Sequence, residues 1–178
     1  LQREAIAILR TQLPAGADSL STALTSLGAA IQEVRRGVEA LPLYEEALEL
    51  RRQVHGERSV RYARALSDLG SAHMYTPDPA PAPPLLERAL ELQRELLAPN
   101  DLDLALTLER LASALRMCQR KEESLPYWSE ALERLREAVG PAHARTKRVR
   151  QRYALTLREV GRASEADAVE ASALEAEK

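Results

Sequence analysis

Apolar residues recur along the chain at intervals of three and four, which is the spacing of one buried face of an α-helix. The first stripe consists of Leu20, Leu24, Leu27, Ile31 and Val34. A second stripe follows at Leu41, Tyr44, Ala47, Leu48, Leu50 and Val54. Between them, Arg35-Arg36-Gly37 indicates the end of the first helix, because glycine commonly follows a last helical turn. The pattern therefore predicts a helical hairpin.

The hairpin is repeated along the chain with a period of 42 residues, since the dipeptide Ala-Leu stands at 47–48, 89–90, 131–132 and 173–174. A fixed period over a whole chain is the signature of one supersecondary unit that has been copied. A column of small residues keeps the same step, at Gly28, Gly70, Ala112 and Ala154. A column of large residues does so at Tyr44, Leu86 and Trp128. We expect the small residues where two helices approach most closely, with the large residues filling the neighbouring space.

Prolines keep the same step at Pro42, Pro84 and Pro126, which predicts that they lie in or near the first turn of each second helix. Four further prolines precede Pro84 in the segment 76–83, which therefore cannot be regular helix. This segment predicts a longer hairpin turn, followed by a second helix that is shortened by roughly one turn. A proline-rich ligand for an aromatic groove of a partner is the alternative.

These columns resemble the tetratricopeptide repeat (TPR). The family pattern of Leu-Gly in the first helix, then Ala, a large aromatic residue and Ala in the second, is met by Leu27-Gly28, Ala40, Tyr44 and Ala47. The usual unit has 34 residues, so the longer period implies longer helices, similar to the repeats of kinesin light chain and nephrocystin-type proteins. The resemblance implies an all-α fold, namely a right-handed superhelical TPR solenoid of antiparallel helical hairpins.

The repeat phase treats residues 1–178 as a single TPR array of about nine helices without strands. Residues 1–18 are expected to hold the second helix of a truncated repeat, which matches Leu1 to Leu13. Four helical hairpins are expected at residues 19–58, 59–99, 100–141 and 142–178. Because the chain starts in mid-repeat and ends inside a second helix at Lys178, we expect a fragment of a longer protein.

The sequence carries no pattern typical of a catalytic, cofactor or metal site. His55, His73 and His143 occupy different repeat positions, so no helix face presents two metal ligands at a spacing of three or four. His73 falls in an apolar column and is expected to be half-buried, and Trp128 is expected in the core. Nucleophile elbows and phosphate-binding glycine loops are absent from the sequence. We therefore expect a protein that is not an enzyme and that binds no cofactor and no metal.

The charge balance changes this picture little, since the net charge is −2. It does not call for nucleic acid or an acidic membrane surface as a partner. One cysteine, Cys118, cannot form an internal disulfide, and no apolar run approaches the roughly 20 residues of a membrane span. The expected location is cytoplasmic, with association with the cytoskeleton as an extension of it.

The feature of the sequence that points to a function is the expected concave surface of the array. In TPR arrays the first helices line the concave face, and the resemblance assigns residues of this chain to it. The expected peptide-binding residues are Arg64, Ser67, Ser71, Glu109, Ser113, Arg116, Arg148, Gln151, Arg152 and Arg158. Arg51 and Arg52, on a second helix, are expected to lie away from this surface. The ligand end of the groove is expected at Arg116, Arg148 and Arg158.

Two explanations of the basic residues stay open. Their guanidinium groups could hold an acidic peptide, or they could pair with acidic residues on the neighbouring helix. The sequence thus predicts a non-catalytic protein-protein interaction scaffold that binds an acidic peptide or partner segment on its concave face. The alternative is a structural spacer or adaptor subunit in a large cytoskeletal, ciliary or motor assembly.

Overall fold

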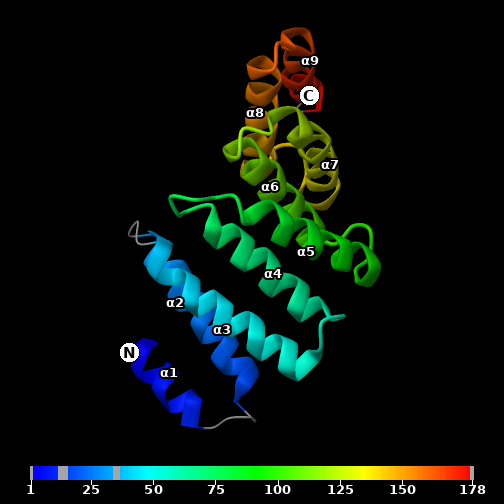
Figure 1. Ribbon diagram of the computed structural model, residues 1–178. Coiled ribbons are helices and arrows are strands. Elements are labelled where there is room, and N and C mark those ends of the chain that lie inside the picture. The colour runs from blue at the N-terminus through cyan, green and yellow to red at the C-terminus, as the bar shows by residue number, and fades with distance from the viewer. Residues whose placement is uncertain (1, 12–15, 34–36, 177–178) are drawn as a thin grey trace. The chain divides into compact units, whose positions relative to one another are not determined.

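The computed structural model describes residues 2–11, 16–33 and 37–176 (Figure 1). Over these residues the chain forms nine α-helices and no strand, as the repeat phase predicted. The helices are α1 (Gln2–Thr11), α2 (Ala17–Glu33), α3 (Gly37–His55), α4 (Val60–His73), α5 (Ala82–Leu96), α6 (Leu102–Met117), α7 (Lys121–Val139), α8 (Ala144–Glu159) and α9 (Ala163–Ala176). The predictions that rest on Leu1, Leu13, Val34, Arg35, Arg36, Lys178 and the side chains of Ala173 and Leu174 fall outside the described residues.

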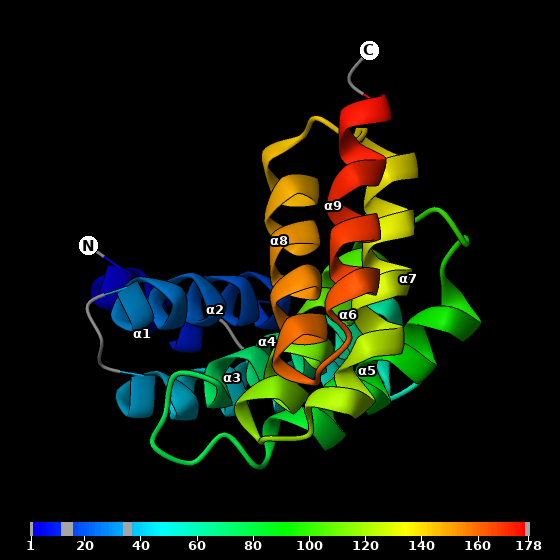
Figure 2. The ribbon, with the colours of Figure 1, turned by 90° about the horizontal axis from the view of Figure 1, so that it is seen from above.

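The helices belong to two compact units, Leu1–Leu96 and Leu97–Lys178. In the first unit, which contains α1 to α5, helices that follow each other along the chain pack together in pairs from α1–α2 to α4–α5. In the second unit the same holds for α6 to α9, and α7, α8 and α9 stand side by side in Figure 2. Packing between consecutive helices is what the predicted helical hairpins require.

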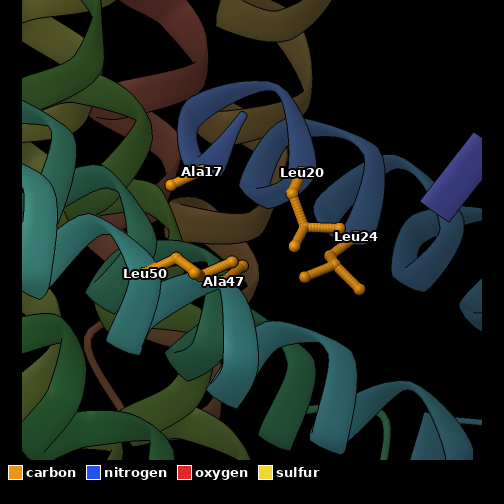
Figure 3. Packing of buried hydrophobic residues seen from close by; sticks show 5 residues of the cluster. All are labelled: Ala17, Leu20, Leu24, Ala47 and Leu50. Atoms are coloured by element: carbon orange, nitrogen blue, oxygen red, sulfur yellow. The ribbon is translucent and has the colours of Figure 1, made fainter. Parts of the chain in front are cut away.

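The core of the first unit lies in the seams between consecutive helices. Between α2 and α3, Leu20 and Leu24 are buried together with Ala47 and Leu50, and Ala17 closes the start of α2 (Figure 3). All but Ala17 belong to the two stripes predicted above. Full burial of a leucine side chain stabilises a fold by about 1.5 to 3 kcal/mol, so each seam contributes several such increments.

The small and large columns face each other, as predicted. A Cβ atom added to Gly28 would lie 2.7 Å from Cε2 of Tyr44 across the α2–α3 seam. The same addition to Gly70 would lie 2.7 Å from Cγ of Leu86 across the α4–α5 seam. In the second unit Trp128 is fully buried, which confirms its place in the core. Glycine is therefore required at positions 28 and 70, where Tyr44 and Leu86 cross closely.

One expectation about helix ends is wrong. Gly37 is the first residue of α3 and not a stop after α2, and a Cβ there would overlap the carbonyl oxygen of Tyr75. The prolines lie in or near the first turn of each second helix, as predicted: Pro42 and Pro126 are the sixth residues of α3 and α7. Only Pro84, the third residue of α5, lies in a first turn.

The proline-rich segment forms the connection between α4 and α5. Local hydrogen bonds shape its start: the Thr76 hydroxyl lies 2.8 Å from the carbonyl oxygens of both His73 and Asp78, and the Asp78 carboxylate accepts from the Ala80 amide. Helix α5 has 15 residues, whereas α3 and α7 each have 19. The difference is about one turn of 3.6 residues, which confirms the predicted shortening.

Candidate functional site

The structure distributes the predicted site residues over two units that we describe separately. Arg64, Ser67 and Ser71 lie on α4 in the first unit. The other seven residues lie on α6 and α8 in the second unit, where ion pairs join the two helices. We call the surface formed by Glu109, Ser113, Arg116, Arg148, Gln151, Arg152 and Glu159 the α6–α8 face.

The first ion-pair group on the α6–α8 face is centred on Glu109. Its Oε1 accepts from Nη2 of Arg148 at 3.0 Å, and its Oε2 accepts from Nη1 of Arg145 at 3.3 Å. The Glu109 side chain is only 13% exposed, whereas that of Arg148 is 51% exposed. One carboxylate therefore serves two guanidinium groups, which leaves the group with a net charge of +1.

The second ion-pair group is centred on Glu159, the last residue of α8, which faces the C-terminal end of α6. Arg116 donates to it through two nitrogens, from Nε at 3.1 Å and from Nη2 at 2.5 Å. Nζ of Lys121 lies 3.3 Å from the same carboxylate. The hydrogen bond from Arg116 is the main cause that holds the pKa of Glu159 below its ordinary value. This group also combines two cations with one carboxylate, so its net charge is +1.

Arg158 does not belong to the α6–α8 face, which corrects the expected ligand end of the groove. Its guanidinium donates to Asp167 at 2.8 Å and to Glu170 at 2.8 Å, both on α9. Glu159, the next residue along α8, is the one that reaches α6, where it pairs with Arg116.

The predicted serines and polar residues differ in exposure. Ser67 is 1% exposed, so it packs between helices and cannot contact a ligand, which corrects its assignment. Ser71 and Ser113 are half-buried, while Gln151 and Arg152 are exposed. The last two residues therefore offer the accessible polar groups of α8 between the ion-pair groups.

Sequence reasoning missed the position of Arg51 in the first unit. Its side chain is 13% exposed, and its Nε donates to the hydroxyl of Ser21 on α2 at 3.2 Å. Its Nη1 lies 4.0 Å from Oδ2 of Asp68 on α4. Arg51 therefore lies where α2, α3 and α4 meet, and not away from the first helices. The repeat phase carried this signal, because Leu135, two periods later, is fully buried.

A family model for the tetratricopeptide repeat matches residues 19–95 and 103–177. The chain belongs to the tetratricopeptide-repeat family. TPR arrays are in general scaffolds that bind proteins and are not enzymes. The TPR match extends into both compact units, in agreement with the helical hairpins that each unit contains.

Solved structures with the same fold include TPR proteins of the kinesin light chain type. The nearly identical TPR-like repeats of a protein assigned to the kinesin light chains of Podosopora anserina align with 15% identity and a TM-score of 0.80, over 86% of this chain and 73% of that one. BtubC (BKLC) from P. vanneervenii aligns with 20% identity and a TM-score of 0.75, over 93% and 66% of the two chains. MamA aligns with 18% identity and a TM-score of 0.66, over 99% and 88%. No curated protein matches the sequence.

These similarities confirm the predicted TPR fold and its likeness to kinesin light chain repeats. The part of the TPR chain that the structure describes holds no group of three side chains suited to a metal ion. Within the same residues, no helix is long and apolar enough to cross a membrane. The half-buried position of His73 agrees with the expectation of a structural histidine.

Proposed function

We propose that this TPR chain is a non-catalytic scaffold that binds an acidic segment of a partner protein along the α6–α8 face. The observation that carries the proposal is the ratio of charges in the two ion-pair groups. Each group shares one carboxylate between two cations, so a further carboxylate finds unsatisfied positive charge at both ends of the face. Arg152 adds an exposed cation to the same helix.

Internal ion pairs compete with such a partner, and their strength decides whether binding is feasible. Arg148 and Arg145 are 51% and 38% exposed, which places their pairs with Glu109 close to the surface. Exposed ion pairs contribute only about 0 to 1 kcal/mol each. A partner that supplies several carboxylates can offset this cost, and its binding should weaken steeply as salt rises.

In TPR arrays the first helices of successive hairpins line the concave face, and α6 and α8 are such first helices. We therefore propose that the α6–α8 face is part of the concave peptide-binding surface. The half-buried Ser113 has a short side chain and supports the proposal, because it leaves space beside the charged groups for a peptide backbone.

The second candidate function is that of a structural spacer or adaptor in a larger assembly. The same ion pairs favour it, since they join α6 directly to α8 without any ligand. In that case the α6–α8 face is a joint that keeps consecutive hairpins in place, and binding takes place elsewhere on the chain.

The substitution Glu109→Gln separates the two functions. It removes the internal carboxylate that competes for Arg145 and Arg148 and keeps the shape of the side chain. A scaffold for acidic segments should then bind a fluorescein-labelled peptide of alternating Glu and Gly several-fold more tightly, as measured by fluorescence anisotropy. A spacer should instead lose stability, with no change in peptide binding.

The double variant Arg116→Glu with Arg148→Glu provides the opposite perturbation. We expect about a tenfold or larger loss of affinity for the same peptide, because both ion-pair groups then carry excess negative charge. The matched control is Arg52→Glu with Arg88→Glu, two exposed arginines that pair with Glu49 and Glu91 on second helices of the first unit. Equal losses in both double variants would show general electrostatics and refute the assignment to the α6–α8 face.

A further inference from the structure

The residues that precede α4, α6 and α8 share one column of the repeat, since Ser59, Asp101 and His143 follow each other at steps of 42 residues. Each of them has an extended backbone and stands at the N-cap position of its helix. Their side chains accept hydrogen bonds from amides of the first helical turn, at 3.2, 2.9 and 3.2 Å respectively. First-turn amides have no acceptor within the helix, so this column supplies one to each first helix.

His143 differs from the other two caps because its hydrogen bond depends on the protonation of a ring. Its Nδ1 accepts from the backbone amide of Arg145, which requires a neutral imidazole that carries its proton on Nε2. A second proton would bind at Nδ1 and turn this acceptor into a donor, so the bond to the amide would be lost. Histidine is the side chain whose charge ordinarily changes between pH 5 and 8. Serine, which stands in this column at Ser59, keeps its acceptor throughout that range.

The surroundings of the α8 N-terminus make an additional positive charge unfavourable. The charged groups of this region are Arg136 and Glu137 at the end of α7, Glu109 on α6, and Arg145, Lys147 and Arg148 at the start of α8. Helix α9 pairs with α8 at Arg158, near the other end of α8. The first turn of α8 contains no acidic residue, and Glu109 already serves two guanidinium groups. An imidazolium would therefore add a cation at the positive end of the helix dipole.

We propose that His143 makes the first turn of α8 sensitive to pH. The neutral ring caps the helix, and the protonated ring releases the Arg145 amide and opens the turn. Because the capped state holds the ring neutral, it binds fewer protons than the open state, so the stability of the turn falls as the pH falls. Opening also draws Arg145 away from Glu109, which it contacts at 3.3 Å. The proposal concerns the fold of α8 and does not depend on the scaffold function.

Two substitutions at residue 143 bracket the two states of the ring. His143→Ser provides the cap that the repeat itself carries at Ser59 and does not titrate, whereas His143→Ala provides no cap at any pH. The measurement is the helical Cα chemical shift of residues 144–147 in the full chain, between pH 8 and 5.5, where carboxyl groups ordinarily stay ionised. The unsubstituted chain should match His143→Ser at pH 8 and approach His143→Ala at pH 5.5. The ratio of open to closed first turns should rise about fivefold, as for the loss of one N-cap.

The other two histidines provide matched controls, because His55 and His73 lie on α3 and α4 in the first unit. His55→Gln and His73→Gln should retain the full pH dependence of residues 144–147, and His143→Ser should lose it. The proposal would be overturned if the unsubstituted chain showed no change, or if His143→Ser changed as much. A rise in helicity on acidification would also overturn it, because the imidazolium would then have found an acidic partner.

The tautomer of the ring gives a direct test at a single pH. The ring ¹⁵N resonances of His143 at pH 8 should be those of a neutral imidazole with its proton on Nε2, since only this form lets Nδ1 accept from the Arg145 amide. On acidification, the Arg145 amide resonance should shift together with the His143 ring resonances. A ring with its proton on Nδ1 at pH 8 would contradict the cap and overturn the proposal.

Discussion

The substitution Gly70→Ala sets two effects of similar size against each other. Replacing a glycine in the interior of a helix by alanine normally stabilises the fold by about 0.5 to 1 kcal/mol. At residue 70, however, the new Cβ would lie 2.7 Å from Cγ of Leu86 and 3.3 Å from the carbonyl oxygen of Ala82. Leu86 is fully buried and its Cγ is a branch point, so it cannot move aside cheaply. Overpacking of this kind costs about 1 to 3 kcal/mol, so after the gain in helix propensity is subtracted we expect a net loss of up to about 2.5 kcal/mol.

A double-mutant cycle with Leu86→Ala measures the two effects separately. In the Leu86→Ala background the obstructing Cγ is absent, so Gly70→Ala should stabilise the chain by its helix propensity, about 0.5 to 1 kcal/mol. The assay is urea denaturation followed by circular dichroism at low temperature, because Leu86→Ala alone costs about 2 to 5 kcal/mol. If Gly70→Ala stabilised both backgrounds equally, the close approach of α4 and α5 at Gly70 would be refuted.

Three further predictions concern packing and pH. Ala89 is fully buried, so Ala89→Leu should lower the melting temperature, whereas leucine at the exposed Arg88 should have little effect; equal melting shifts would contradict the register. Gly37→Ala should destabilise the first unit because its Cβ would overlap the Tyr75 backbone, and faster amide hydrogen exchange in α3 and α4 should report this; unchanged exchange would argue against the contact. The pKa of Glu159 is lowered in the folded chain, so its contribution to stability is present above the ordinary value of 4.5 and is lost as the pH falls further. Glu159→Gln should therefore reduce stability at neutral pH and flatten its decline below about pH 4.5, and parallel pH profiles of the denaturation midpoint for the two proteins would exclude this role.

The helical content, the repeat phase and the pairing of small with large residues all follow from the amino-acid sequence. The repeat columns predicted that Gly28 lies opposite Tyr44 and Gly70 opposite Leu86. This prediction was possible because helix periodicity and excluded volume act in the same way in each repeated unit. The shortening of α5 was also predictable, since proline excludes regular helix within the chain segment that contains it.

The pairing of the charged side chains, in contrast, depends on how the helices pack. Arg148 and Arg145 both pair with Glu109, whereas Arg158 pairs with Asp167 on α9. The side chain of arginine is long and has several rotatable bonds, so its partner depends on which helices pack beside it. Gly37 was misread as a helix stop because its partner, the Tyr75 carbonyl oxygen, lies far away in sequence. Arg51 shows the same limit, since its burial depends on two helices that converge on a third. Periodicity is a property of each segment, whereas the partners of a side chain depend on contacts between segments.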